Sequence, residues 1–171
     1  DSADTYQDSG TGVGDVDTLD ASNVPILLLT KNFVNSGLEV IEGAITKTIL
    51  AANTSSLVWD FSDTTLINIK QINGSQSSDQ ITGSLGNDKI KGLDGNDELN
   101  GGNGSDKLVG GGGDDTFIFD TALGNSNVDT IVKFNSADDV ISLDNDIFTS
   151  LTTSAGNKLS ASEFVANSSG T

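Results

Sequence analysis

A nine-residue repeat occupies the middle of this 171-residue chain and limits its possible folds more than any other feature. Four full copies begin at Gly83, Gly92, Gly101 and Gly110, and a degenerate copy begins at Gly74. A short fixed period is typical of solenoids, in which each repeat contacts only its neighbours. The repeat therefore decides the fold class ahead of any local propensity.

Three positions recur in all five copies of the repeat. The first is Gly, whose backbone freedom permits a six-residue turn and whose missing side chain lets carbonyl oxygens approach a cation. The sixth position holds Asp79, Asp88, Asp97, Asp106 and Asp115, and the eighth holds Ile81, Ile90, Leu99, Leu108 and Phe117. Because mostly polar or small residues flank each apolar one, the last three residues of a repeat are expected to form a strand with one inward side chain.

A three-residue strand is not stable alone, so the strands of the repeats must stack in register. Each Ile or Leu buried by this stacking contributes roughly 1.5–3 kcal/mol. A turn that reverses the chain every nine residues places successive strands in opposite sheets, so one coil takes 18 residues. We therefore expect an all-β fold, a parallel β-roll, which is a β-solenoid of two sheets.

Calcium is expected from the stacking of the sixth-position aspartates. Asp79, Asp97 and Asp115 are expected along one edge of the solenoid, and Asp88 and Asp106 along the other. Stacked strands lie about 4.8 Å apart, so uncompensated carboxylates in these columns repel one another. A divalent cation between turns removes the repulsion, and hard oxygen donors favour calcium over softer metals.

The composition agrees with oxygen ligands and excludes several other functions. The chain has no His, Cys or Met, which excludes zinc fingers, haem ligation, disulfides and mechanisms that need an imidazole base. A formal net charge of −17 without any Arg excludes nucleic acid as a partner. The longest apolar run, residues 26–29, is too short for a membrane span, and residues 1–20 lack the features of a signal peptide.

The repeat over residues 73–118 resembles the glycine-rich nonapeptide of the RTX, or hemolysin-type calcium-binding, family. The resemblance implies that the β-roll is right-handed, with calcium in its turns, and that each ion lies between turns one coil apart. One turn supplies the carbonyls of its second and fourth positions and its Asp, and the next turn supplies its first and third carbonyls and its Asp. On this sequence, site 1 consists of Ser84, Gly86 and Asp88 with Gly101, Asn103 and Asp106; site 2 of Leu93, Gly95 and Asp97 with Gly110, Gly112 and Asp115; and site 3 of Ser75, Ser77 and Asp79 with Gly92, Asp94 and Asp97.

A linker, an EF-hand and a phosphate-binding loop each fit the glycine-rich stretch less well. A flexible acidic linker does not require the strict spacing or the unbroken apolar column. An EF-hand loop needs a bidentate Glu at its twelfth position between two helices, and no segment offers one. A phosphate-binding loop needs a Lys and a following helix, whereas these glycines recur through a strand pattern.

Upstream, residues 1–72 are expected to form degenerate, largely metal-free rungs of the same solenoid. Ile41, Leu50 and Trp59 keep a spacing of nine, and Ile72 restarts the phase that leads into the repeats. The corresponding sixth positions are Glu39, Thr48 and Leu57, which do not form an oxygen cage. A plain β-rich packing of this segment without register is the alternative.

Downstream, residues 119–171 are expected to form a capping region. Asp129 follows Gly124 at the repeat spacing, and it either closes the last open calcium half-site or serves in a simple turn. Ser160 to Glu163 is a capping-box pattern that predicts a short final helix. The side chains expected to plug the open end of the roll are Phe117, Phe119, Ile131, Phe134, Ile141 and Leu143.

The sequence favours a calcium-binding module over an enzyme. The resemblance implies the C-terminal part of a larger protein that is exported by a type I secretion apparatus and folds in extracellular calcium. We expect such a module to be secreted or at the cell surface, and monomeric as a fragment. The alternatives are a spacer or cap in a structural or adhesive surface protein, or an accessory module of a secreted enzyme. Catalysis is not expected, because ionised metal ligands are poor general acids and no nucleophile motif is present.

The ends of the chain carry two further expectations. Asp4-Thr5-Tyr6 and Asp17-Thr18-Leu19 match the end of a repeat, so the chain is expected to begin inside a longer array. In related chains the sequence commonly continues past a capping region such as this one. The secretion signal is therefore expected to be partly or wholly missing at Thr171.

Overall fold

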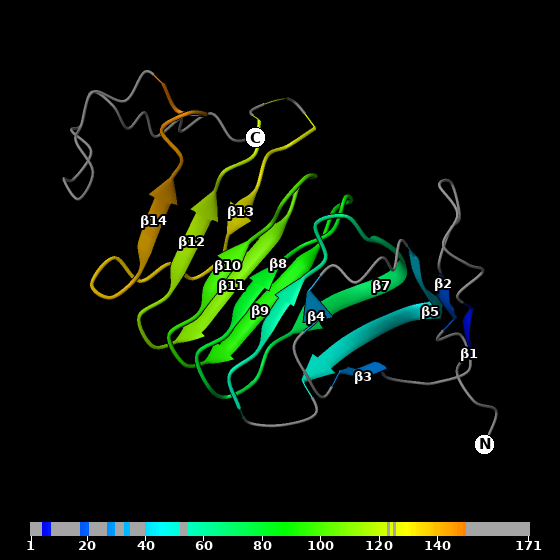
Figure 1. Cartoon of the computed structure of the whole chain (residues 1–171). Coiled ribbons are helices and arrows are strands. Elements are labelled where there is room, and N and C mark those ends of the chain that lie inside the picture. The colour runs from blue at the N-terminus through cyan, green and yellow to red at the C-terminus, as the bar shows by residue number, and fades with distance from the viewer. Residues whose placement is uncertain are drawn as a thin grey trace.

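The expected parallel β-roll is confirmed by the computed structural model of the chain. The structure describes residues 5–7, 18–20, 27–29, 33–34, 40–51, 55–122, 124 and 126–149. Within these ranges the chain forms only strands, turns and bends, and it winds as a solenoid of about 4 turns. Figure 1 shows the strands in a row, from β14 on one side to β1 on the other.

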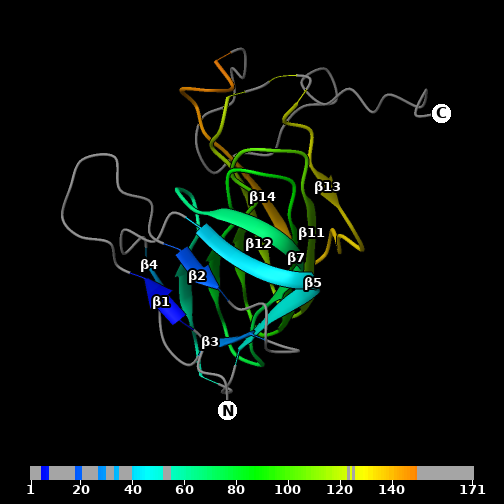
Figure 2. The ribbon, with the colours of Figure 1, turned by 90° about the vertical axis from the view of Figure 1, so that its right-hand side faces the viewer.

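Two sheets form the walls of the solenoid. Sheet A contains β1 (Thr5–Gln7), β2 (Thr18–Asp20), β3 (Leu27–Leu29), β5 (Val40–Ala51), β7 (Thr65–Asn73), β9 (Lys89–Asp94), β11 (Lys107–Gly112) and β13 (Thr130–Ile131). Sheet B contains β4 (Phe33–Val34), β6 (Val58–Asp60), β8 (Gln80–Thr82), β10 (Glu98–Asn100), β12 (Thr116–Phe119) and β14 (Val140–Leu143). From β4 onward the chain alternates between the sheets, and Figure 2 looks along the row of coils. All the strand pairs are parallel except β1 with β2, which is antiparallel.

A narrow apolar core lies between the sheets, with one column of side chains from each wall. The columns consist of Ile49, Ile72, Ile90 and Leu108 from sheet A and of Trp59, Ile81, Leu99 and Phe117 from sheet B. Each of these side chains is at most 1% exposed. The eighth-position residues of the repeat are therefore all in the core, as the alternation of the strands predicts.

The coils of the repeat are shorter than those that flank them. Ile90 and Leu108 are register partners 18 residues apart, whereas the coil from Ile49 to Ile72 takes 23 residues. The longer coil accommodates β5 and β7, of 12 and 9 residues. The nine-residue period therefore describes the two central coils and does not extend upstream.

The spacing proposed from Ile41 through Leu50 to Trp59 is wrong for this reason. Ile49 is the residue that pairs with Ile72 in the core column, and Ile41 pairs with Leu66 at the other end of β5. The register between β5 and β7 shifts after Glu42, and a shift of one residue moves the opposite set of side chains to the core.

The last rung is only partly buried. Phe117 is 0% exposed, and Phe119 and Ile131 pack against the core. Phe134 and Ile141 are 39% and 40% exposed, and the ring centroid of Phe134 lies 6.0 Å from that of Phe117. Their role as part of a plug stays a prediction. They lie on the outermost coil that the structure describes, where no further rung among the described residues covers them. The expected helix at residues 160–163 lies outside the described residues.

Candidate metal centre

The six-residue turns of the repeat stack on one another at the two edges of the solenoid. Turn 83–88 lies against turn 101–106: the Asp88 N–H donates to Asp106 Oδ1 at 2.7 Å. The Ser105 N–H donates to Asn87 Oδ1 at 2.8 Å. Two turns that are distant in sequence are thereby locked in register.

The same contact repeats along the other edge, and it forms the predicted aspartate columns. The Asp79 N–H donates to Asp97 Oδ1 at 2.9 Å, and the Asp97 N–H donates to Asp115 Oδ1 at 3.0 Å. The partners are 18 residues apart in each case. In each of these contacts, one carboxylate oxygen of the later turn accepts a hydrogen bond from the backbone N–H of the earlier turn.

The second oxygen of three aspartates has no partner. Asp97, Asp106 and Asp115 are 1%, 2% and 1% exposed, and among the described residues no hydrogen bond reaches their Oδ2 atoms. A buried carboxylate oxygen without a donor is costly unless a cation compensates it. Each predicted site contains one such oxygen from its second turn: Asp106 in site 1, Asp115 in site 2 and Asp97 in site 3. The residues present therefore fit a bound cation.

The first-position glycines make room for these oxygens. A Cβ at Gly92 would lie 1.9 Å from Asp97 Oδ2, and a Cβ at Gly110 would lie 2.0 Å from Asp115 Oδ2. No real side chain tolerates such contacts, so Gly at this position is required by the placement of the carboxylate.

The turns that begin at Gly74 and Gly83 are built differently. The Ser75 N–H donates to Asp79 Oδ2, and the Ser84 N–H donates to Asp88 Oδ2, both at 2.6 Å. In these two turns a backbone N–H therefore donates to the carboxylate oxygen that has no partner in the three later turns. These two turns lie where no repeat turn precedes them on the same edge, so we interpret them as the closed end of the array.

Backbone conformation also separates the two kinds of turn. The second and fourth positions of the three later turns have positive φ, which the first two turns lack: Leu93 94°, Gly95 119°, Gly102 82°, Gly104 116°, Gly111 141° and Gly113 119°. The φ of a residue orients the peptide plane that carries the preceding carbonyl. Positive φ at the second and fourth positions thus turns the carbonyls of the first and third positions. Those are the carbonyls that the resemblance assigns to the second turn of each site.

The comparisons with known proteins identify the repeat. The family model of the RTX calcium-binding nonapeptide repeat matches residues 73–108 and 82–117, with four copies. This chain contains an RTX calcium-binding repeat domain. Repeats of this family bind Ca²⁺, so calcium is the cofactor of the domain. Neither the curated proteins nor the solved structures contain a match to the chain.

Most ligand atoms in such an RTX site must come from the backbone. Among the described residues there is no group of three or more acidic side chains close enough to hold an ion together. Two carboxylates from stacked turns, supplemented by carbonyl oxygens, meet the six to eight oxygen ligands that calcium prefers.

Within the described part of the chain no helix is long and apolar enough to cross a membrane.

Burial raises the pKa of the aspartates in the RTX columns. Desolvation, and then the charges of neighbouring aspartates, raises the pKa of Asp97 and of Asp106 to about 7, although each accepts a backbone hydrogen bond. Desolvation likewise raises the pKa of Asp88, Asp115 and Asp129. Without a cation these carboxyls are therefore easier to protonate than ordinary aspartates.

This shift predicts that acid stabilises the calcium-free fold. Asp97 and Asp106 have a higher pKa folded, about 7, than the ordinary 3.8 expected when unfolded. Their contribution is therefore present at low pH and is lost as the pH rises through 7. Circular dichroism in calcium-free buffer should show more β-structure at about pH 5 than at about pH 8. A signal that decreases steadily on acidification would contradict this.

Leu93 is a strained residue within site 2. Its φ of 94° lies in a region that favours Gly, and the matching positions in the next two turns are Gly102 and Gly111. Leu93→Gly relieves this strain, but a new Gly costs backbone entropy on folding. We expect the net effect to raise the free energy of unfolding of the calcium-loaded domain by about 1 kcal/mol. Thermal unfolding with calcium measures this. Leu85→Gly is the matched control, since Leu85 is 49% exposed and lacks positive φ, and it should lower stability instead.

Two further aspartates continue the columns beyond the matched repeats. The Asp106 N–H donates to Asp129 Oδ1 at 2.9 Å, and the Asp115 N–H donates to Asp139 Oδ1 at 3.2 Å. Asp129 thus lies next in the column after Asp106, as its spacing from Gly124 predicts. Asp139 was missed, because its turn is not glycine-rich; the signal that would have found it is Ile141 two positions later, the Asp-x-apolar ending of a repeat.

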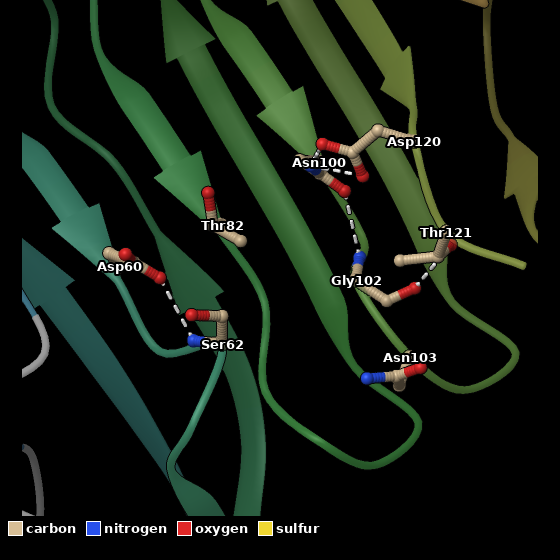
Figure 3. A pocket seen from close by; sticks show the side chains of 8 residues that line it. All are labelled: Asp60, Ser62, Thr82, Asn100, Gly102, Asn103, Asp120 and Thr121. Carbon is tan, nitrogen blue, oxygen red and sulfur yellow. Dashed lines mark hydrogen bonds between the residues drawn. The ribbon is translucent and has the colours of Figure 1, made fainter. Parts of the chain in front are cut away.

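A shallow polar pocket on sheet B is separate from the carboxylate columns. Figure 3 shows that Asp120 points toward Asn100, whose amide Nδ2 donates to both carboxylate oxygens of Asp120 at 2.9 Å. The other lining residues are Asp60, Ser62, Thr82, Gly102, Asn103 and Thr121. Asn103 belongs to site 1 only through its backbone carbonyl, so its side chain in this pocket is not a predicted ligand.

Proposed function

We propose that the domain holds three calcium ions, one at each of sites 1, 2 and 3, with the ligands that the RTX pattern assigns. The observation that carries this proposal is the buried, unpartnered Oδ2 atom in the second turn of each site. Site 3 has the same feature in its second turn, because Asp97 contributes its unpartnered oxygen there and its turn has positive φ at Leu93 and Gly95. In this assignment Asp97 serves two ions.

Calcium acts in this proposal as the switch that folds the module. Three uncompensated buried oxygens oppose folding of the metal-free chain, and no site exists in the unfolded chain. The free energy of calcium binding therefore becomes free energy of folding. A module of this kind stays unfolded where calcium is scarce and folds outside the cell, which agrees with type I secretion of a larger protein and a secreted or cell-surface location.

The regions around the repeats have supporting roles in this proposal. Residues 1–72 extend the sheets without metal, residues 73–118 hold the ions, and residues 119–171 cap the roll. Within the cap, Asp129 supplies an acceptor for the last repeat turn on its edge. We assign no catalytic role to the buried carboxylates, since they are committed to calcium.

Far-ultraviolet circular dichroism with and without calcium tests the proposal. Calcium in the millimolar range should raise the β-sheet signal cooperatively, with a chelator reversing the change and magnesium failing to replace it. Magnesium is the matched control because it has the same charge and demands a smaller octahedral site. A β-sheet spectrum that is the same in chelator and in calcium would contradict the proposal.

A further inference from the structure

A ladder of lysines stands on the outer face of sheet A. Ile90 and Leu108 point into the core, so the flanking Lys89, Lys91 and Lys107 lie on the opposite face of β9 and β11. Lys89 and Lys107 are direct register partners in adjacent coils. Lys70 is exposed at a register irregularity within β7, and it lies close enough to interact electrostatically with Lys89. These four residues are the lysine ladder.

The lysine ladder is not explained by ion pairs within the fold. Among the described residues no ion pair joins any of the four side chains to an acidic group. Like charges on directly opposed strand positions are destabilising. Partial burial, and then the ammonium groups of Lys91, Lys107 and Lys70, lower the pKa of Lys89. With 25 acidic residues against eight basic ones, the chain nevertheless places four of its cations together.

The surroundings of the ladder restrict the shape of its partner. The turns that border sheet A carry carboxylates that reach the surface, with Asp94 and Asp114 exposed at one edge and Asp88 and Asp129 partly exposed at the other. A broad anionic surface such as a membrane would therefore also meet carboxylates. A thin polymer lying along the solenoid axis would contact the lysines alone. Lys89 and Lys107, which are opposite each other in adjacent coils, are separated by about one strand spacing of 4.8 Å, which suits a chain with repeated anions.

The chemistry of the face favours a saccharide over a nucleic acid. The outward neighbours of the lysines are residues such as Gln71, Asn73 and Val109, and no aromatic ring accompanies them on the described part of this face. Single-stranded nucleic acids are held by aromatic stacking together with phosphate contacts. Carboxylated saccharides need only cations and hydrogen-bonding groups.

We propose that the outer face of sheet A binds a linear acidic polysaccharide, whose carboxylates pair with Lys70, Lys89, Lys91 and Lys107. The ladder exists only when two or more coils are stacked. Binding therefore rests on the calcium-driven folding proposed above. Single exposed ion pairs are weak, so the interaction is multivalent and weakens strongly with salt.

The test measures binding of the full chain, in calcium, to polygalacturonate at low and high salt, with uncharged dextran as the reference polymer. The wild type should bind polygalacturonate at low salt, should not bind it at high salt, and should not bind dextran at either salt concentration. The double variant Lys89→Gln/Lys107→Gln should bind roughly tenfold more weakly. Lys133→Gln, which removes an exposed lysine after β13 and outside the ladder, should bind like the wild type.

Several outcomes would overturn the polysaccharide proposal. These are a folded wild type that does not bind polygalacturonate, equal binding by the double variant, or equally tight binding of single-stranded DNA. Self-association that the double variant abolishes, seen in gel filtration without polymer, would assign the face to a second copy instead. Circular dichroism on the same samples distinguishes failure of the polysaccharide proposal from failure of the calcium-driven folding. A chain that is folded in chelator contradicts only the calcium-driven folding.

Discussion

Replacing Asp97 by Asn is expected to remove two of the three calcium ions and to leave the domain largely unfolded at calcium concentrations that fold the wild type. Asp97 belongs to sites 2 and 3 in our assignment. Its side chain is 1% exposed, and its Oδ2 atom has no hydrogen-bond partner among the described residues. The substitution preserves an oxygen that can accept the hydrogen bond from the Asp79 N–H, so the backbone contact at 2.9 Å is retained.

The expected size of this effect follows from the linkage of binding to folding. A ligand at a hundred times its dissociation constant stabilises the state that binds it by about 2.7 kcal/mol. Loss of two such ions therefore costs about 5 kcal/mol, which is comparable to the whole stability of a marginal domain. The calcium concentration at the folding midpoint should rise more than about tenfold, and calorimetric titration should count one ion in place of three.

Asp114→Asn is the matched control for this variant. It removes the same charge one residue before Asp115, but Asp114 is exposed and belongs to none of the three sites. Its backbone N–H, which donates to Asn96 Oδ1, is unchanged. We expect wild-type stoichiometry and a nearly unchanged midpoint. Equal losses in both variants would show that overall charge, and not ligation, explains the effect.

Gly111→Ala is expected to lower the free energy of unfolding by about 3 kcal/mol or more, even in saturating calcium. Gly111 has a φ of 141°, and a Cβ there would lie 1.7 Å from the carbonyl oxygen of Leu93. That oxygen belongs to the backbone of the adjacent coil, so it cannot move aside as a flexible side chain would. Because Leu93 is a proposed ligand of site 2, the clash should also weaken calcium binding there.

The adjacent glycine provides the control. A Cβ at Gly112 would lie 3.4 Å from Asp94 Oδ1 and meet nothing closer, and its φ is not positive. Gly112→Ala should therefore change stability by less than about 1 kcal/mol in denaturant titrations with calcium. If the two variants are equally stable, the close stacking of the coils at Leu93 is wrong.

The strict part of the repeat made the central coils predictable. Since every nonapeptide has the same length, the register of Ile90 with Leu108 and the contact of Asp88 with Asp106 follow from counting residues. The apolar side chain two positions after each Asp is then fixed in the core by the alternation of the strand.

The flanking coils were less predictable because their length varies. The choice between Ile49 and Leu50 depends on a register shift within β5 that no residue type marks. Asp139 lies in a turn without the glycines that identify a repeat, and it is found only when the structure shows its carboxylate accepting the Asp115 N–H.

The two kinds of turn were also not apparent from spacing. The serine-containing turns carry the same sixth-position Asp as the others, yet Ser75 and Ser84 satisfy the oxygen that the later turns leave without a partner. A second-position Ser, where the last two copies have Gly102 and Gly111, is the signal that distinguishes them. Its meaning depends on three-dimensional context, since the turn must also lie at the end of its column.

Anomalous diffraction from a calcium-loaded crystal is the sharpest test of the proposed ligation, because it locates the ions. We expect three calcium peaks, each beside one of the Oδ2 atoms of Asp97, Asp106 and Asp115 and between turns one coil apart. The first turns, closed by Ser75 and Ser84, should have no ion on their outer side. Absence of calcium beside these three oxygens, in a domain folded as described, would contradict the three-ion assignment.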